Sequence, residues 1–142
     1  KWAELAASIG KDIGVDVAVL CASYEEKKSK PVADATRGTL MLSNTPESHV
    51  PNILSCDLVI ATDTGLKHVA AYLGLPVIGI YGHSSPTIWG TGRDNETVMR
   101  GQSECLPCNN PFLCEHGHPI CLESIVTEEV ANRAKSLLGV SA

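Results

Sequence analysis

The spacing of apolar residues changes several times along the 142-residue chain, from the period of a helix to that of a strand and back. Near the start, apolar residues recur at helical spacing, which predicts a helix. A short, nearly continuous apolar run follows, and such a run is typical of a strand covered on both faces. The predicted helices span residues 1–14, 24–35, 45–56, 65–74 and 126–139, and the predicted strands span residues 15–22, 38–44, 57–62, 75–82 and 97–101.

Helices and strands of these lengths alternate along the chain. This order predicts an α/β fold with a parallel, doubly wound sheet, in which helical crossovers join the strands. The length suits one ordinary domain, so we expect a single domain over residues 1–142. After residue 82 the pattern loosens into a turn-rich stretch, and a cysteine-rich loop over residues 105–121 precedes the last helix.

Composition narrows the function classes a little. Hydrophobic residues make up 44% of the chain and charged residues 19%, which is typical of a globular protein. The formal net charge of −5 argues against a nucleic-acid partner, because such partners usually select a basic face. Neither a bilayer-crossing apolar run nor a signal-peptide pattern is found, so we expect at most peripheral membrane association. The chain begins with Lys1 rather than methionine, which indicates a piece of a longer protein.

The junction after the strand at residues 57–62 carries residues that folding alone does not require. Asp63, Thr64 and Gly65 fall where this strand gives way to a helix, and ligands of doubly wound sheets collect at such ends. The free amides of the first helical turn and the helix dipole suit an anion such as phosphate. Gly65 permits close approach, Thr64 adds a hydroxyl, and His68 can donate a hydrogen bond. The alternative is that Asp63 only caps the helix and His68 is a half-buried helix residue.

A second junction with similar chemistry follows the next predicted strand. Residues 80–90, IYGHSSPTIWG, are rich in glycine and hydroxyl side chains. Parallel strands end at the same edge of a sheet, so the two junctions should be neighbours. Together they favour a ligand that carries a diphosphate.

Four of the six cysteines are clustered. Cys105, Cys108, Cys114 and Cys121 have the spacing C-x2-C-x5-C-x6-C. The first pair can bind one tetrahedral metal ion, and the other two thiolates would complete its shell. Three alternatives stay open: a structural zinc or iron–sulfur site, two disulfides, or free thiols. A cytosolic setting disfavours disulfides in the cell.

Several blocks of the sequence resemble the C-terminal half of the bacterial family-9 glycosyltransferases, the heptosyltransferases that build the inner core of lipopolysaccharide. The blocks are DLVIATDTGLKHVAAYLGLPVIGIYGHSSPTIWG, VMRG, CLPC and IVTEEVANRAKSLL, in this order. The similarity runs from Trp2 to the end and is densest over residues 57–90. It implies a GT-B fold, in which two Rossmann-like domains face a cleft and the C-terminal one holds the nucleotide-sugar donor.

The resemblance also implies roles for single residues. Asp63, Thr64 and Gly65 would meet the sugar and diphosphate of the donor, with His68 beside them. By the same resemblance, this chain would be the C-terminal, donor-binding domain.

Two earlier residues match positions that bind the nucleoside in the resembled family. Glu25 matches a carboxylate that accepts hydrogen bonds from the ribose hydroxyls, and two acceptor oxygens suit a diol. The alternative for Glu25 is a solvated charge beside Glu26 and two lysines. Asn44 matches a position near the base, where its amide could read an adenine edge.

The sequence departs from the resembled family in three respects. His83 and Ser85 stand where the family commonly has proline and aspartate. Lys67 stands where a small residue or methionine is usual; it could add a positive charge near the diphosphate, or be a solvated helix lysine. The family's acceptor-binding N-terminal domain, with its proposed catalytic aspartate, and the first strand of the C-terminal domain are absent from this sequence. We therefore expect no catalytic residue in this chain.

The leading interpretation is the donor-binding half of an inverting, ADP-heptose-type glycosyltransferase of lipopolysaccharide core biosynthesis, inactive alone and without a catalytic metal. Its partners would be an ADP-sugar and, through the missing domain, a lipid-linked oligosaccharide. The expected location is the cytoplasm, at the inner face of the inner membrane. Two alternatives are a GT-B enzyme that uses UDP or GDP donors and a non-enzymatic Rossmann-like module whose metal-stapled loop docks a partner.

Overall fold

The computed structural model describes residues 1–106, 108 and 113–140. The chain divides into two compact units, of which the first comprises Lys1–Ser55 with Thr127–Ala142 and the second Cys56–Val126. The predicted α/β class with parallel strands is confirmed, although the strands lie in two parallel sheets, one in each unit, where the sequence suggested one.

The first unit contains a two-stranded parallel sheet. Strand β1 (Ala18–Ala22) pairs with β2 (Thr39–Ser43) so that Ala18 lies opposite Thr39. Helix α2 (Glu26–Asp34) connects the strands after a 3-10 turn (Ser23–Glu25) and contacts both of them. The two strands therefore end at the same edge of their sheet, as a parallel pair joined by a crossover helix must.

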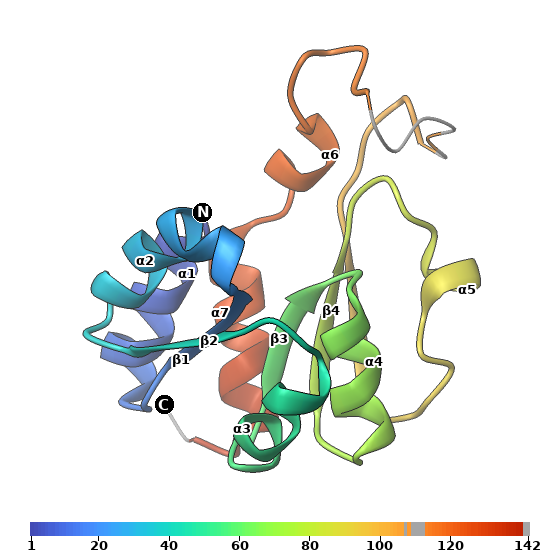
Figure 1. Ribbon diagram of the computed structural model, residues 1–142. Coiled ribbons are helices and arrows are strands. Elements are labelled where there is room, and N and C mark those ends of the chain that lie inside the picture. Colours follow the sequence, from blue (N-terminus) through green and yellow to red (C-terminus); the bar gives the residue numbers. More distant parts are fainter. Residues whose placement is uncertain (107, 109–112, 141–142) are drawn as a thin grey trace. The chain divides into compact units, whose positions relative to one another are not determined.

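The other helices of the first unit come from both ends of the chain (Figure 1). Helix α1 (Trp2–Ser8) runs on into a π-helical turn (Ile9–Ile13), which ends at Gly14 in the left-handed conformation. Helix α7 (Thr127–Leu137) packs beside α1. The segment after β2 forms a 3-10 turn (Glu47–His49) and the short helix α3 (Val50–Leu54).

Burial of β1 differs from the expectation. The apolar run predicted a strand covered on both faces, but Cys21 is its one buried residue and Ala18 is exposed. The prediction is wrong for this strand. An apolar run shows that the side chains can be buried, but whether they are buried depends on the elements that pack against the strand.

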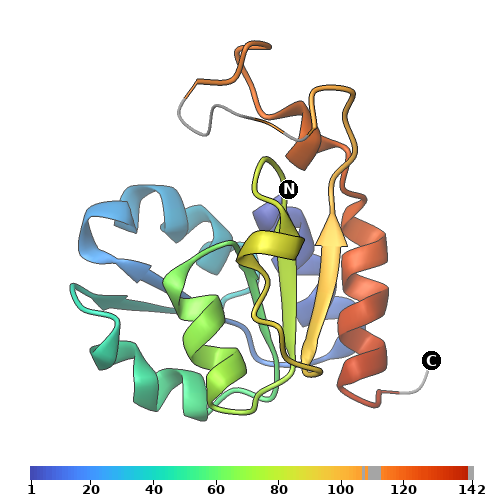
Figure 2. The same ribbon diagram turned by 90° about the vertical axis from the view of Figure 1, so that its right-hand side faces the viewer.

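The second unit contains a three-stranded parallel sheet in the order β3-β4-β5, which Figure 2 shows nearly edge-on. The strands are β3 (Val59–Thr62), β4 (Val77–Tyr81) and β5 (Glu96–Arg100). Helix α4 (Gly65–Tyr72) connects β3 to β4. Val77 pairs with Val59 on one side and with Glu96 on the other, so all three strands run in step and end at one edge.

Two short helices of the second unit were not predicted. Helix α5 (Pro86–Trp89) follows β4, and helix α6 (Ile120–Glu123) follows the cysteine-rich segment. Each is about one turn long, which is too short to establish an apolar periodicity in the sequence. Residues 107 and 109–112 of the predicted loop 105–121 lie outside the described residues.

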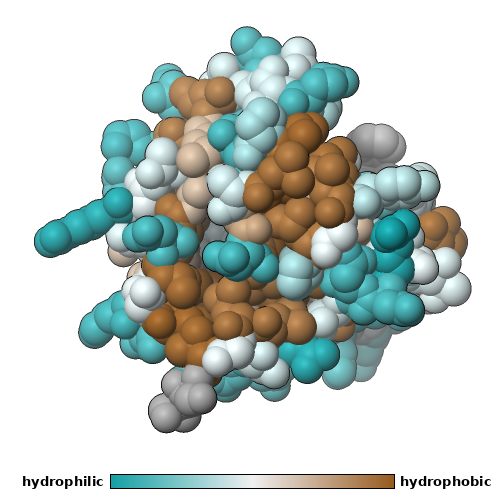
Figure 3. Space-filling model, turned by 90° about the horizontal axis from the view of Figure 1, so that it is seen from below, coloured by the Kyte–Doolittle hydropathy of each residue, from teal (hydrophilic) through white to brown (hydrophobic). Residues whose placement is uncertain are grey.

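Large apolar side chains remain exposed on both units. They include Leu42 and Leu54 in the first unit and Tyr72, Ile88 and Trp89 in the second. Figure 3 shows one face on which brown, apolar side chains reach the surface between teal, polar ones. In the described part of the chain, no helix combines the length and the apolar character that crossing a membrane would require.

Strand β4 is the core of the second unit, since every one of its residues is buried. Replacing Val77, which is 0% exposed, by alanine removes buried methyl groups and leaves a cavity. We expect the free energy of unfolding to fall by about 2 kcal/mol. The matched control is Val98→Ala on the neighbouring strand β5, where the valine is 45% exposed and the loss should be much smaller. Chemical denaturation of the two variants measures the difference, and equal losses would contradict this account of the core.

Candidate functional site

The junction between β3 and α4 is open at its surface. Thr64 is the N-cap residue of α4 and has an extended backbone, with φ −137° and ψ 161°. Thr64 and Gly65 are both exposed, and a Cβ added at Gly65 would meet no atom within 4 Å. The first-turn amides of α4 can therefore reach a ligand from outside the fold.

Of the alternative reading, the part in which Asp63 caps α4 is wrong, whereas His68 is indeed a half-buried helix residue. The N-cap position belongs to Thr64, and no side-chain hydrogen bond caps this helix. The Asp63 carboxylate instead turns towards the side chains of the first helical turn: Oδ1 lies 3.1 Å from Lys67 Nζ and 3.7 Å from His68 Nε2. The side chain of Asp63 is 20% exposed and that of His68 is 40% exposed. Both can touch a ligand at the helix end.

Lys67 is buried. The expectation that it might be a solvated helix lysine is wrong, because the residue is 0% exposed. Its ammonium group donates to Asp63 Oδ1, to the Tyr81 hydroxyl and, at 2.8 Å, to the carbonyl of Trp89. It also lies 4.3 Å from the centroid of the Tyr81 ring. With no exposed surface, this ammonium cannot touch a donor directly, so any effect on a diphosphate must pass through its neighbours.

Glu96, at the start of β5, completes this polar group. Its Oε1 accepts a hydrogen bond of 2.6 Å from the Tyr81 hydroxyl and lies 3.6 Å from Lys67 Nζ. Its Oε2 accepts from the backbone amide and the hydroxyl of Thr91, at 2.6 and 2.7 Å. The Glu96 side chain is 3% exposed. We call Asp63, Lys67, Tyr81, Glu96 and Thr91 the Lys67 network.

Gly79 makes room for this network in the middle of β4. A Cβ at this position would overlap Glu96 Oε1 and would lie 2.8 Å from Tyr81 Cε2. A glycine inside a strand weakens the strand unless another group approaches closely. Gly79 in VIGIY, together with the glutamate that opens the next strand, was the signal in the sequence that could have revealed the network.

Ionisation of the network follows from its burial and hydrogen bonds. Burial works to raise the pKa of Glu96, but hydrogen bonds from Tyr81 and Thr91 and the charge of Lys67 outweigh it, so this pKa lies below its ordinary value. Burial raises the pKa of Tyr81 strongly, and the hydrogen bond to Glu96 and its charge add to the effect. At neutral pH the network therefore holds an ionised Glu96 and a neutral tyrosine.

The second junction contacts Lys67 through the hydroxyl of Tyr81, at the end of β4, and through the carbonyl of Trp89. Helix α5 ends at Trp89, whose carbonyl oxygen accepts from Lys67. Upstream of this helix His83 is exposed and Ser84 is buried. The two junctions predicted to be neighbours are thus joined by a direct hydrogen bond.

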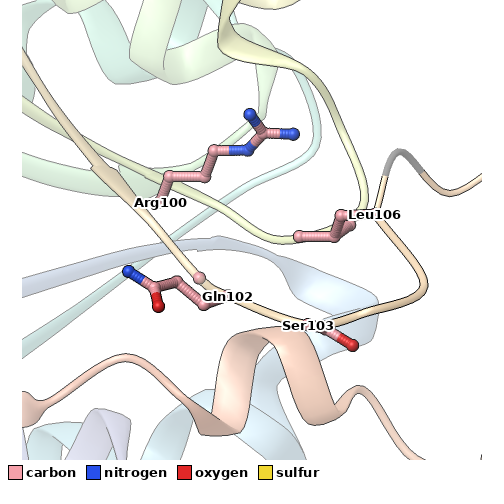
Figure 4. A pocket seen from close by; sticks show the side chains of 5 residues that line it. Arg100, Gln102, Ser103 and Leu106 are labelled. Carbon is pink, nitrogen blue, oxygen red and sulfur yellow. The ribbon is translucent and has the colours of Figure 1, made fainter.

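An open pocket lies beyond the carboxyl end of β5. It has a volume of about 320 Å³ and is lined by Arg100, Gly101, Gln102, Ser103 and Leu106. Figure 4 shows the guanidinium of Arg100 extending away from the ribbon, on the same side of the segment as Leu106. Arg100 is exposed and adds a positive charge at the edge where β3 also ends. In the sequence, Arg100 stands in a predicted strand and in the block VMRG that resembles the family, and neither pattern assigned it to a site.

The two predicted nucleoside-binding residues lie in the first unit. Glu25 follows β1 and Asn44 follows β2, so both stand at the carboxyl edge of the two-stranded sheet. The Glu25 carboxylate accepts a hydrogen bond of 3.4 Å from the amide of Ala22, and Asn44 is exposed. Their roles towards ribose and base stay predictions.

The cysteine cluster is partly tied into the second unit. Cys121 is 6% exposed, and burial, with the charges of Cys105 and Cys114, raises the pKa of its thiol. Cys105, Cys114 and Cys121 are free thiols here. Cys114 donates to the carbonyl of His118 at 2.9 Å. Over the described residues, no three side chains of histidine, cysteine, aspartate or glutamate converge closely enough to hold a metal ion.

In an open α/β fold, ligands bind beyond the carboxyl ends of the strands, where this chain has an open helix end. The model of glycosyltransferase family 9 (heptosyltransferase) matches residues 1–116, so the chain belongs to this family. Among curated proteins it is similar to lipopolysaccharide heptosyltransferase 1 of Escherichia coli K12, with 30% identity over 107 residues, which are 74% of this chain and 33% of that protein. It is also similar to lipooligosaccharide heptosyltransferase 2 of Campylobacter jejuni, with 30% identity over 88 residues, 61% of this chain and 27% of that protein.

Solved structures agree on the fold. The E. coli heptosyltransferase WaaC with ADP superposes with a TM-score of 0.74 and 22% identity, covering 96% of this chain and 38% of that one. The family-9 glycosyl transferase of Veillonella parvula superposes with a TM-score of 0.73 and 21% identity, covering 99% of this chain and 41% of that one. The resemblance seen in the sequence is confirmed, and the chain spans about a third of the length of the curated relatives that it matches.

The Lys67 network predicts a pH-dependent stability. The ordinary pKa of a glutamate such as Glu96 is 4.5 and its folded-state pKa is lower. Its stabilising contribution is therefore fully present above the ordinary pKa and is lost as the pH falls through the folded-state value. We expect Glu96→Gln to lower the free energy of unfolding by a constant amount near neutral pH, and this loss should shrink below about pH 4.5.

Urea denaturation across a pH series measures this difference. The control is Glu128→Gln in the first turn of α7, where the glutamate is exposed and the effect should be small at every pH. If the loss caused by Glu96→Gln did not vary with pH, the carboxylate would not stabilise the network in its charged form.

Proposed function

We propose that this chain is the donor-binding part of an inverting glycosyltransferase that uses an ADP-heptose-type donor in lipopolysaccharide core biosynthesis. The observation that carries this proposal is the open N-terminus of α4, where Thr64 and Gly65 are exposed beyond the end of a parallel strand. Membership of the heptosyltransferase family supports it, and so does the fold shared with a heptosyltransferase whose structure holds ADP.

In this proposal each residue of the junction between β3 and α4 binds a part of the donor. The amides of Gly65 and the next residues, with the Thr64 hydroxyl, would hold the two phosphates. The Asp63 carboxylate, 20% exposed, would accept hydrogen bonds from sugar hydroxyls, and His68 would donate one to the donor. In the first unit, Glu25 and Asn44 would bind the ribose and the base.

Sugar transfer needs a base that deprotonates the attacking hydroxyl, and we assign none to this chain. Asp63 is occupied by Lys67, at 3.1 Å, and we assign His68 to the donor. The acceptor, a lipid-linked oligosaccharide, and the base would belong to an N-terminal domain, so the 142 residues alone should not turn over. We place the enzyme in the cytoplasm, at the inner face of the inner membrane, where donor and acceptor meet.

Replacing Asp63 and Thr64 together by alanine removes one acceptor and one donor from the proposed site. We expect the affinity of the full-length protein for ADP-heptose to fall at least about tenfold, because each lost hydrogen bond costs roughly 1 kcal/mol and the loss is larger beside a charged group. Isothermal titration calorimetry measures the affinity, and UDP- and GDP-sugars titrated in parallel identify the nucleotide.

The matched control is Thr127→Ala with Glu128→Ala, which changes the same kinds of residue at the start of α7. This control should leave the affinity unchanged. A full-length protein that binds no nucleotide-sugar, or a site variant that binds as well as the wild type, would contradict the proposed function. A partner protein lost on Cys105→Ser, in a protein that nucleotides do not stabilise, would favour the docking-module alternative.

We also propose that Cys105, Cys108, Cys114 and Cys121 form a structural cross-link, as a zinc or iron–sulfur site or as two disulfides. Support comes from their spacing, C-x2-C-x5-C-x6-C. The segment between Arg100 and α6 has no helix or strand among its described residues, so it would gain most from such a link.

Elemental analysis and intact mass of the full-length protein, purified without added reductant, test the cross-link. We expect a stoichiometric metal that is lost in Cys105→Ser, together with a lower melting temperature. Cys21→Ser, a buried cysteine outside the cluster, should keep the metal. A mass reduced by two hydrogens for each bond would identify disulfides, and four alkylatable thiols without metal would contradict any cross-link.

A further inference from the structure

Lys67 places a buried positive charge directly behind the proposed phosphate site. We propose that this charge neutralises the Asp63 carboxylate and so strengthens the binding of a diphosphate beside it. This assignment rests on the proposed function and adds a positioning residue to it.

The geometry limits how Lys67 can act. Its ammonium group is 0% exposed, so a ligand at the surface cannot reach it. Asp63 lies between the Lys67 ammonium group and the surface: its Oδ1 is 3.1 Å from Lys67 Nζ, and its side chain is 20% exposed. The charge of Lys67 therefore reaches the site through the carboxylate that it binds.

Glu96 interacts with the Lys67 ammonium group more weakly than Asp63 does. It lies 3.6 Å from Lys67 Nζ, beyond hydrogen-bond distance, whereas Asp63 accepts a hydrogen bond from it. The carboxylate oxygens of Glu96 accept hydrogen bonds from the Tyr81 hydroxyl, at 2.6 Å, and from the amide and hydroxyl of Thr91, at 2.6 and 2.7 Å. These three bonds stabilise the Glu96 charge, and the ammonium group remains available to Asp63.

Lys67 also fixes the position of Asp63. Its third donor binds the carbonyl of Trp89 at 2.8 Å, which ties the first junction to the second. A carboxylate held from behind in this way presents its free lone pairs outward to sugar hydroxyls. Without the cation, an unpaired carboxylate a few ångströms from two phosphates would oppose binding by Coulomb repulsion.

The test is a mutant cycle in the full-length protein, with ADP as the probe because it carries the diphosphate without the sugar. Lys67→Met with Glu96→Gln removes a buried charge of each sign, which avoids leaving Glu96 uncompensated. We expect this pair to weaken ADP binding about tenfold at low salt, and less at high salt because ions screen the exposed charge. Adding Asp63→Asn, which removes the repelling charge, should restore most of the lost affinity.

Asp63→Asn alone provides a second measurement that does not depend on the stability of the core variants. The amide keeps an acceptor for Lys67 but leaves its charge in excess, so ADP should bind a few-fold more tightly than to the wild type, with a steeper salt dependence. Unchanged or weaker binding would overturn the inference.

The outcomes separate the two proposals. A wild-type protein that does not bind ADP overturns the proposed function itself. A wild type that binds, with a Lys67→Met and Glu96→Gln variant that binds equally well, overturns only the role of Lys67. A loss of affinity that persists after Asp63→Asn assigns Lys67 to the stability of the fold, and melting temperatures recorded for each variant would then fall in parallel with affinity.

Discussion

A charge removed from water must be compensated by its surroundings, and the second unit is organised around one such charge. The ammonium group of Lys67 is 0% exposed and meets a carboxylate from the junction before its own helix, a tyrosine from β4 and a carbonyl from the end of α5. Because each partner comes from a different element, the ion pair holds the strand ends and the following loops in one arrangement. That arrangement requires a glycine at position 79, because a Cβ there would overlap Glu96 and Tyr81.

The parallel sheet supplies the second constraint. Strands β3, β4 and β5 run in step, so the residues that follow them gather at one edge. A helix that starts at this edge presents unpaired amides there, which is why Thr64 and Gly65 are exposed although they follow the apolar strand β3. The anion site proposed for this family member thus follows from topology and helix polarity, before any side chain is considered.

Lys67 shows how a buried residue can change the charge at a site without changing the residues at its surface. The exposed Thr64 and Gly65 and the half-buried Asp63 and His68 follow the resemblance to the family, whereas the buried lysine departs from it. A buried lysine there requires partners for its charge: Asp63 accepts a hydrogen bond from it, and the carboxylate of Glu96 lies 3.6 Å away. In the proposed site, the residues at the surface follow the family pattern, and the buried Lys67 and Glu96 beneath them change the local charge.

The sequence by itself determined the α/β class, the order of strands and helices, and the junction at Asp63–Thr64–Gly65, because apolar periodicity and helix-start residues are local signals. It could not decide that Lys67 is buried, since a lysine on a helix looks the same whether or not a glutamate more than twenty residues later closes over it. It also missed α5 and α6, which are about one turn each, and the incomplete cover of β1. Only the tertiary structure joins residues 63, 67, 81 and 96, because pairing between distant segments leaves no local pattern along the chain.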